Sequence, residues 1–385
     1  MLPGYLDKIL SFFFLKRNYI TFLKILDNRQ TGMKPDIDIR KKIFEVRKSN
    51  KFSWSYDTQS FSRQHKYLKS FFPALTCFNE KGWKDSDYFL LHGPINPFVP
   101  HEGHMKFLPL HRRMLFMEDG FFHSLKTFAD PKASPEERSS LSYLFDDTAF
   151  YFDGTRKSRL EEKLNSKSEL TPVERDRVRK LITLISQNKL TKYNNQPIRN
   201  ADYGNNKKVL IIDQSFNDSS IIYGNTDENT FKIILQCAID ENPDKDILIK
   251  THPDSRFKKR TYFSDVIETS RIKIVADSIN PWCLFDISDK VYVCSSQAGF
   301  EALMAGKHVV VFGSPFYSGW GLTDDRRPKK GRTRSRTLEE LVYYALIWYT
   351  HYVNPSSGDL CEIEDTLKYL LHQRDRYFSL NEISA

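Results

Sequence analysis

The feature that most constrains the fold is a regular alternation of short apolar runs and helical stretches between residues 209 and 312. The apolar runs predict strands at 209–212, 247–249, 272–275, 291–294 and 309–312. Helical spacing and helix-start signals predict helices at 230–239, 281–286 and 297–305. Strands that alternate with helices at this spacing form parallel sheets through right-handed crossovers. This part of the chain is therefore predicted to be an α/β domain.

Polar clusters follow three of these strands. They are Asp213-Gln214-Ser215, Lys250-Thr251-His252-Pro253 and Ser295-Ser296-Gln297. Parallel strands end side by side, and open α/β sheets bind ligands at that edge. Ser296 precedes a predicted helix, so its hydroxyl and the first helical amides suit an anion, with a plain helix cap as the alternative. Lys250 and His252 would add cationic donors to the same anion, and Glu301, about one turn into the helix, could accept the hydroxyls of a ribose.

Several common chemistries lose their usual sequence support. The chain has no GxGxxG, GxxxxGK[ST] or HExxH motif, which disfavours dinucleotide, P-loop and zincin sites. Its 5 cysteines show no CxxC spacing, which disfavours a disulfide framework and a zinc site and favours a cytoplasmic protein. We therefore expect neither a metal nor a cofactor.

The charge balance points to anionic partners. Lys and Arg number 58 against 49 Asp and Glu, a net charge of +9, which favours phosphate-bearing or acidic molecules. Basic and aromatic residues do not interleave as in nucleic-acid-binding modules, so no nucleic acid is expected. The basic tract 326–336 is interpreted as a solvated loop, with contact to anionic lipid or acceptor as the alternative.

The N-terminal apolar run at 9–15 is too short to cross a bilayer, and it lacks the features of a signal peptide. A packed helix is favoured, and a membrane-surface or partner-binding helix is the alternative. The polar, Asn-rich stretch 191–208 predicts an interdomain linker. We therefore predict an N-terminal domain at 1–200, a second domain at 201–355, and a C-terminal helix at 356–385 that packs back toward the first domain.

An ordered set of motifs between about residues 114 and 360 resembles a known family. The motifs are Glu118 to Phe121, Phe145 to Thr148, Tyr151 to Glu161, Val209 to Ser215, Lys250 to Asp254, Asn280 to Trp282, Ser295 to Gly306 and Pro315 to Arg326. Together they resemble the bacterial capsule polysaccharide biosynthesis family of the KpsC, KpsS and LipB type, which are retaining β-Kdo glycosyltransferases. Kdo is an eight-carbon acidic sugar delivered as CMP-Kdo. The chain carries one such module, where the KpsC type has two.

The resemblance implies a GT-B-like α/β fold, with two Rossmann-like domains, a cleft between them, and the donor CMP-Kdo bound mainly by the C-terminal one. Asp213 matches the family's catalytic nucleophile, and the matching Gln214 that follows it is implied to bind the donor. The implied donor-binding residues are His252 and Lys250 for the phosphate, Ser295, Ser296 and Gln297 for the phosphate or sugar carboxylate, and Glu301 for the cytidine ribose.

The expected chemistry follows from retention at the anomeric carbon. Two inversions give net retention, with a carboxylate attacking first and the acceptor hydroxyl displacing it. Glu118 is our choice for the base that takes the acceptor proton, with Asp119 and then Asp153 as alternatives. Arg156 and Arg159 are candidates to bind the carboxylate of the sugar or of the acceptor, or else are solvated.

The predicted function is transfer of Kdo from CMP-Kdo to a glycan or glycolipid acceptor, namely a bacterial surface polysaccharide or its lipid linker. The expected location is the cytoplasm, with a peripheral site at the inner membrane or in a polysaccharide assembly complex as a further possibility. Two alternatives remain: a GT-B transferase that uses another CMP-activated acidic sugar, and a non-catalytic glycan-binding module of the same fold.

Overall fold

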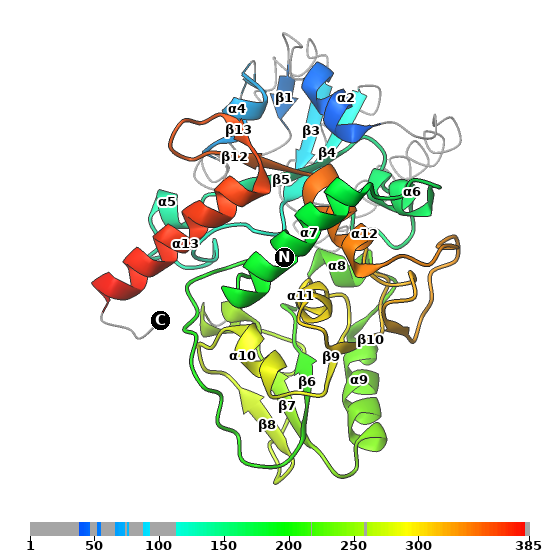
Figure 1. Cartoon of the computed structure of the whole chain (residues 1–385). Helices are drawn as coiled ribbons and strands as arrows, with labels where there is room; N and C mark the ends of the chain where they lie inside the picture. The colour runs from blue at the N-terminus through cyan, green and yellow to red at the C-terminus, as the bar shows by residue number, and fades with distance from the viewer. Residues whose placement is uncertain are drawn as a thin grey trace, which may run out of the picture.

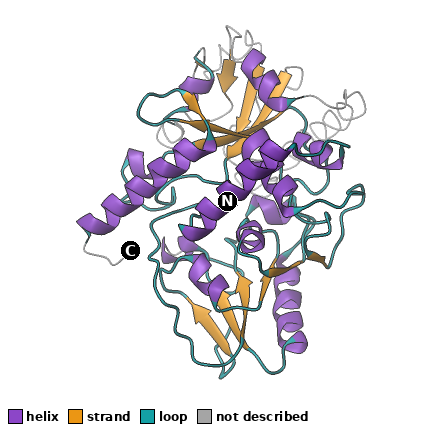
Figure 2. Cartoon of the chain, in the orientation of Figure 1, coloured by secondary structure: helices purple, strands orange, loops and turns teal. Residues whose placement is uncertain are grey.

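The computed structural model describes residues 38–46, 52–54, 66–73, 75–76, 88–92, 113–216, 218–257 and 260–381. The predicted N-terminal helix around residues 9–15 lies outside the described residues. The described strands form two separate sheets, one in the upper half of Figure 1 and one in the lower half. Helices surround both sheets (Figure 2), which confirms the predicted α/β class.

The lower sheet, called the second sheet here, has six strands. They are β6 (Lys208–Ile212), β7 (Asp246–Lys250), β8 (Ile272–Val275), β9 (Lys290–Val293), β10 (His308–Val311) and β11 (Asp324–Asp325). Their order is β11-β10-β9-β6-β7-β8, and every pairing is parallel. The first strand, β6, is central and the order reverses between β6 and β9, as in doubly wound sheets. The predicted parallel sheet is confirmed.

Strand β6 shows why this sheet needs cover on both faces. Val209 and Ile211 belong to one buried cluster with residues of helix α9 (Glu228–Glu241). Leu210 and Ile212 belong to a second cluster that includes residues of α10 (Pro281–Asp286) and α11 (Ala298–Met304). Successive side chains of a strand point to opposite faces, so a strand apolar at every position is buried between two helical layers.

The upper sheet, called the first sheet here, has seven strands. They are β1 (Phe52–Trp54), β2 (Leu75–Thr76), β3 (Tyr88–His92), β4 (Arg113–Asp119), β5 (Ser142–Asp146), β12 (Thr350–Val353) and β13 (Leu360–Cys361). Their order is β13-β12-β5-β4-β3-β1-β2. The four strands β1 to β4 pair in parallel, whereas β5, β12 and β13 are antiparallel to their neighbours. This sheet is therefore mixed, and only its β1–β4 part is parallel as in a Rossmann-like sheet.

The remaining helices are α2 (Ile39–Val46), α4 (Leu68–Phe71), α5 (Pro135–Arg138), α6 (Arg159–Asn165), α7 (Pro172–Gln187), α8 (Ser219–Ile222), α12 (Leu338–Val342) and α13 (Ile363–Leu380), with the 3-10 helix η3 (Pro253–Phe257) and the π-helix η4 (Tyr343–Tyr349). Most of them cover the first sheet and the junction between the sheets, whereas α8 packs against the second sheet through Ile221. Thr171 caps α7, because its hydroxyl accepts from Glu174 N. No helix among the described residues is long and apolar enough to span a membrane.

The chain returns to the first sheet after it completes the second. Thr350 pairs with Leu144 of β5, and before that Tyr343 donates a 2.5 Å hydrogen bond to Glu174 of α7. The domain limits 1–200, 201–355 and 356–385 stay a prediction, although β12 places residues 350–353 in the first sheet.

Candidate active site

A cavity of about 840 Å³ lies where residues of the two halves face each other. Its walls come from the strand ends of the second sheet, from β4 and the loops after β5, and from residues 191–196, which connect the halves. The lining includes Glu118, Tyr151, Lys192, Asp213, His252 and Ser296. A concave, partly apolar site with a few convergent polar groups is typical of ligand binding.

The structure brings the three predicted polar clusters together. Asp213 directly follows β6, Lys250 ends β7, and Ser295 lies shortly after β9. Strand β6 lies between β7 and β9, so its end is next to both other ends, and Asp213 N donates to Lys250 O at 3.0 Å. The cavity therefore opens where the strand order reverses, the usual ligand position in such sheets.

Asp213 is held firmly and is largely out of solvent, with 1 % of its surface exposed. Its Oδ1 accepts hydrogen bonds from Gln214 N at 2.8 Å and Tyr262 N at 3.1 Å. Its Oδ2 has no hydrogen-bond partner within the part of the chain that the structure describes. Burial raises the pKa of Asp213 to about 6, against a lowering by the Thr261 hydroxyl and nearby amides. The site thus contains one oriented carboxylate, one oxygen of which is buried and has no hydrogen-bond partner among the described residues.

His252 and Lys250 place donors on the same side of the cavity. His252 Nδ1 accepts from Asp254 N at 3.2 Å and lies 3.0 Å from Ser215 Oγ. Because Nδ1 is an acceptor, the neutral ring carries its proton on Nε2. The Lys250 ammonium donates to Thr251 O at 3.4 Å and Asp277 O at 3.2 Å. Both residues line the cavity, as Asp213 does, and an imidazole N–H and an ammonium can bind a phosphate leaving group.

Gln214 and Ser295 join the ends of β6 and β9. Gln214 Oε1 accepts from Ser295 N at 3.0 Å, and Gln214 Nε2 donates to Ser220 Oγ at 3.1 Å and Ser295 Oγ at 3.3 Å. Ser296 Oγ accepts from Ala298 N at 3.3 Å, but the N-cap position of α11 is Gln297, so Ser296 is not the helix cap of the alternative interpretation. All three predicted donor-binding residues line the cavity, and the polar groups of Gln214 and Ser295 bind mainly each other.

Gln297 and Glu301 connect α11 to the first half of the molecule. Gln297 Nε2 donates to Phe121 O at 2.7 Å and Glu301 Oε1 at 3.2 Å. Glu301 Oε2 accepts from Thr191 Oγ1 at 2.7 Å, and Glu301 Oε1 accepts from Lys192 N at 3.3 Å. Burial raises the pKa of Glu301 to about 7. Glu301 lines the cavity. Both of its oxygens already accept hydrogen bonds from residues 191 and 192, and its contact with a ribose stays a prediction.

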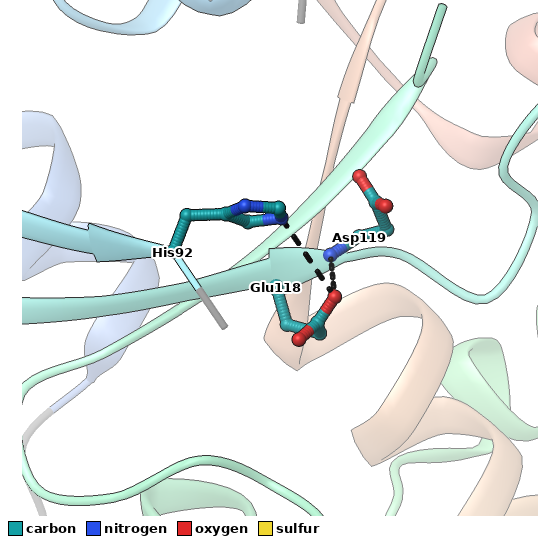
Figure 3. A group of neighbouring side chains, drawn as sticks. All are labelled: His92, Glu118 and Asp119. Atoms are coloured by element: carbon teal, nitrogen blue, oxygen red, sulfur yellow. Dashed lines mark hydrogen bonds and ion pairs between the residues drawn. The ribbon is translucent and has the colours of Figure 1, made fainter. Parts of the chain in front are cut away.

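Glu118 and Asp119 end β4 and point to opposite sides of it (Figure 3). Glu118 lines the cavity, and its Oε1 lies 3.9 Å from His92 Nε2 and accepts from Asp119 N at 3.0 Å. Burial raises the pKa of Glu118, which His92 opposes. Asp119 does not line the cavity, and its Oδ2 lies 3.1 Å from His123 Nε2. The geometry therefore favours Glu118 over Asp119 as the base.

His92, Glu118 and Asp119 each offer a ligand atom within 4.8 Å of the others, a set that suits several metal ions. However, Glu118 and Asp119 both raise the pKa of Lys192, so an ammonium already compensates these carboxylates. No second group of this kind is found among the described residues, and the expected absence of a metal stays a prediction.

Arg156 and Arg159 do not line this cavity. Arg159 Nε donates to Asp147 Oδ1 at 2.7 Å, and its Nη1 donates to Glu162 Oε2 at 2.7 Å. Asp153, the third candidate base, is also outside the lining and lies 3.5 Å from Arg156 Nη1. Arg159 is therefore committed to a buried ion-pair network, and the geometry gives its predicted role no support.

Lys192 is the site residue that the sequence interpretation missed, because it lies at the start of the stretch assigned as a linker. It lines the cavity, and its Nζ lies 5.6 Å from the centre of the Tyr193 ring. Burial opposes its charge, but Tyr193, Tyr151 and the two carboxylates of β4 raise its pKa well above the usual value for lysine. The local signal was a lysine beside a tyrosine, five residues after the end of helix α7. A permanent cation therefore faces the cavity from the first half.

A parallel sheet with a polar cavity at its switch point, closed by a second α/β half, defines a ligand-binding α/β protein. A comparison with family models matches residues 113–355 to the family described as "Capsule polysaccharide biosynthesis protein". The chain belongs to this family, which confirms the resemblance inferred from its motifs.

Two curated relatives are similar over two thirds of the chain. The Neisseria meningitidis serogroup A "Capsule polysaccharide modification protein LipA" is 38% identical over 266 residues, which are 66% of this chain and 37% of the relative. The Rhizobium meliloti "Lipopolysaccharide-processing protein LpsZ" is 35% identical over 267 residues, 67% of this chain and 59% of the relative. The chain thus spans less than two thirds of the length of either protein.

Two solved structures share the fold. The Thermosulfurimonas dismutans "KpsC, beta Kdo 2,4 transferase" superposes with a TM-score of 0.74 and 30% identity, covering 84% of this chain and 98% of that one. The "KpsC, beta Kdo 2,7 transferase" of the same organism gives a TM-score of 0.62 and 24% identity, covering 84% and 99%.

Proposed function

We propose that the chain is a retaining β-Kdo glycosyltransferase of GT-B type that takes Kdo from CMP-Kdo. The observation that carries this proposal is the Asp213 carboxylate, one oxygen of which has no hydrogen-bond partner among the described residues, in a cavity that also contains His252 and Lys250. The similarity to a beta Kdo 2,4 transferase over nearly its whole length supports the same activity. The acceptor is proposed to be a glycan or glycolipid of the bacterial surface, reached from the cytoplasm or the inner-membrane surface.

In the first step, Asp213 Oδ2 attacks the anomeric carbon of Kdo while the bond to the CMP phosphate oxygen breaks. CMP leaves with the bonding electrons, and the Nε2–H of His252 and the Lys250 ammonium stabilise its phosphate. The sugar is then bound to Asp213 through an ester with inverted configuration.

In the second step, an acceptor hydroxyl attacks the same carbon and displaces Asp213, which restores the original configuration. Glu118 faces the cavity from β4, and its raised pKa suits a group that accepts the hydroxyl proton. Lys192 lies beside Glu118 and provides the cation for the sugar carboxylate, the role that the sequence had assigned to Arg156 and Arg159.

The experiment is intact-protein mass spectrometry after incubation with CMP-Kdo, followed by peptide mapping. We expect a Kdo-sized adduct on the peptide with Asp213, and none in the Asp213→Asn variant. Asp265→Asn, which changes an exposed carboxylate, is the matched control and should keep the adduct. Turnover with CMP-sialic acid but not CMP-Kdo would contradict the donor assignment, and a folded Asp213→Asn variant with full function would favour a non-catalytic module.

A further inference from the structure

A second cavity, of about 450 Å³, adjoins the first and has no part in the chemistry above. The two cavities share a wall. Phe152 and Phe316 line the first, whereas Gly154 and Ser314, two residues away in the same segments, line the second. Residues two apart are separated by at most about 7 Å. One layer of chain therefore separates the cavities.

The second cavity is lined mainly by cations. Its basic residues are Arg156, Lys157, Arg327, Lys329 and Lys330, and its one acid is Glu161. They come from the loop before α6 and from the basic tract 326–336, whose function the catalytic proposal leaves open. Two halves of the molecule thus contribute positive charge to the same concave surface.

The acid in this lining is already neutralised. Glu161 Oε2 lies 2.6 Å from Lys329 Nζ and 3.1 Å from Arg332 Nη2. Beyond the lining, Asp153 lies 3.5 Å from Arg156. Acids outside the lining also interact with these cations, namely Asp227 with Arg327 and Glu162 with Lys157. The positive excess is therefore that of the lining itself, in which five basic residues face one acid. Such an excess concentrates anions in a concave site.

The inner part of this cavity is built by close packing rather than by loose surface side chains. Gly154 N donates to Tyr223 O at 2.6 Å, and Asn225 Nδ2 donates to Gly154 O at 3.2 Å. A Cβ atom on Gly154 would lie 3.0 Å from Tyr223 O, so the two halves approach too closely for a side chain. Lys329 Nζ also donates to Arg156 O at 2.8 Å. The cations are therefore presented from a fixed base.

We propose that this second cavity binds an anionic saccharide unit of the acceptor, away from the hydroxyl that reacts. This inference rests on the proposed glycosyl transfer. Guanidinium and ammonium groups suit a carboxylate, and the volume suits a small ligand. Arg327 and Lys330 are exposed, so a longer glycan can enter this cavity from solvent.

The test compares binding of oligogalacturonate, a carboxylate-bearing saccharide, with binding of neutral maltohexaose, by isothermal titration calorimetry of the full chain. Oligogalacturonate should bind and maltohexaose should not. The Arg327→Ala/Lys330→Ala variant should bind oligogalacturonate at least about tenfold more weakly, a loss expected for one or two charged contacts. Lys132→Ala/Lys232→Ala removes two other exposed lysines and should bind normally.

Equal binding by both double variants would overturn the proposal. A second experiment measures binding of the same variants to vesicles that contain phosphatidylglycerol. If the Arg327→Ala/Lys330→Ala variant loses binding to the vesicles while oligogalacturonate never binds, the surface serves lipid and the proposal is wrong. The Kdo adduct on Asp213 forms without acceptor. If the unsubstituted protein forms no adduct, the transferase proposal is contradicted, whereas the binding of oligogalacturonate still tests the second cavity independently.

Discussion

The Glu301 carboxylate of α11 accepts a 2.7 Å hydrogen bond from the Thr191 hydroxyl, which joins the second sheet's helical layer to the segment between the two halves. Glu301 is 2 % exposed, and its pKa is raised to about 7. In the unfolded chain a glutamate titrates near its ordinary value of about 4.3. Between these values the folded state holds a proton that the unfolded state has lost, so stability falls as pH rises through this range.

The first prediction is that Glu301→Gln removes this fall of folding stability with rising pH. The variant should gain stability relative to the unsubstituted protein as pH rises from 5 to 8, by up to about 3 kcal/mol if the whole shift is expressed. Urea unfolding at several pH values measures the difference. Glu169→Gln changes an exposed glutamate, and its difference in the free energy of unfolding from the unsubstituted protein should not vary with pH. A flat profile for Glu301→Gln as well would show that Glu301 titrates normally.

The second prediction concerns the ionisation of Asp213. A carboxylate nucleophile must be ionised, so the rate of donor cleavage should fall about tenfold per pH unit below a pKa of about 6. The Thr261 hydroxyl lowers this pKa, so Thr261→Val should move the midpoint of the profile to higher pH. Burst release of CMP from CMP-Kdo measures the profile. Thr183→Val, on the exposed side of α7, is the control, and an equal shift in both variants would contradict the assignment.

The second sheet could be predicted because its information is local. Runs such as 209–212 are apolar at every position and end at polar residues, so strands and their functional ends are visible together. The placement of Asp213, His252 and Ser296 around one cavity follows from parallel pairing alone. The family resemblance added the expected roles, which the geometry does not by itself assign.

The strand pairing of the first sheet could not be predicted in the same way, because some of its neighbouring strands are far apart in the sequence. Thr350–Val353 pairs with Ser142–Asp146 about two hundred residues earlier, and no local pattern marks such a partner. Lys192 was missed because a polar, Asn-rich composition favours a linker, whereas the fold turns its first residues into a cavity wall. Arg159 was a reasonable ligand by residue type, and only the structure shows its pairing with Asp147.

The third prediction tests Lys192 as the partner of the sugar carboxylate. Lys192→Met should raise the KM for CMP-Kdo about tenfold, because a charge-assisted contact is lost, while the affinity for CMP alone changes little. Calorimetry with CMP and initial rates with CMP-Kdo separate the two effects. Lys180→Met removes an exposed lysine of α7 and should change neither. A parallel loss of CMP affinity would place Lys192 at the phosphate instead.

The last prediction compares two Arg–Glu pairs that differ mainly in burial. Arg332 and Glu161 are 3.1 Å apart with side chains 2% and 5% exposed, whereas Arg179 and Glu339 are 3.2 Å apart at 64% and 24%. Removing one partner of a buried pair costs about 3–5 kcal/mol when it leaves the other charge uncompensated. Lys329 still lies 2.6 Å from Glu161 after the loss of Arg332, so the cost here should be smaller than that. An exposed pair is worth about 0–1 kcal/mol.

Arg332→Met should therefore lower the free energy of unfolding by several times more than Arg179→Met, as measured by urea denaturation near neutral pH. Arg332 also donates to Ser318 O at 2.8 Å, which adds to the loss. The double variant Arg332→Met/Glu161→Gln should not recover this loss, because it also leaves the buried Lys329 ammonium without the carboxylate that lies 2.6 Å away. Equal destabilisation by the two single variants would mean that solvent reaches Glu161, and the charge balance inferred for the second cavity would then be wrong.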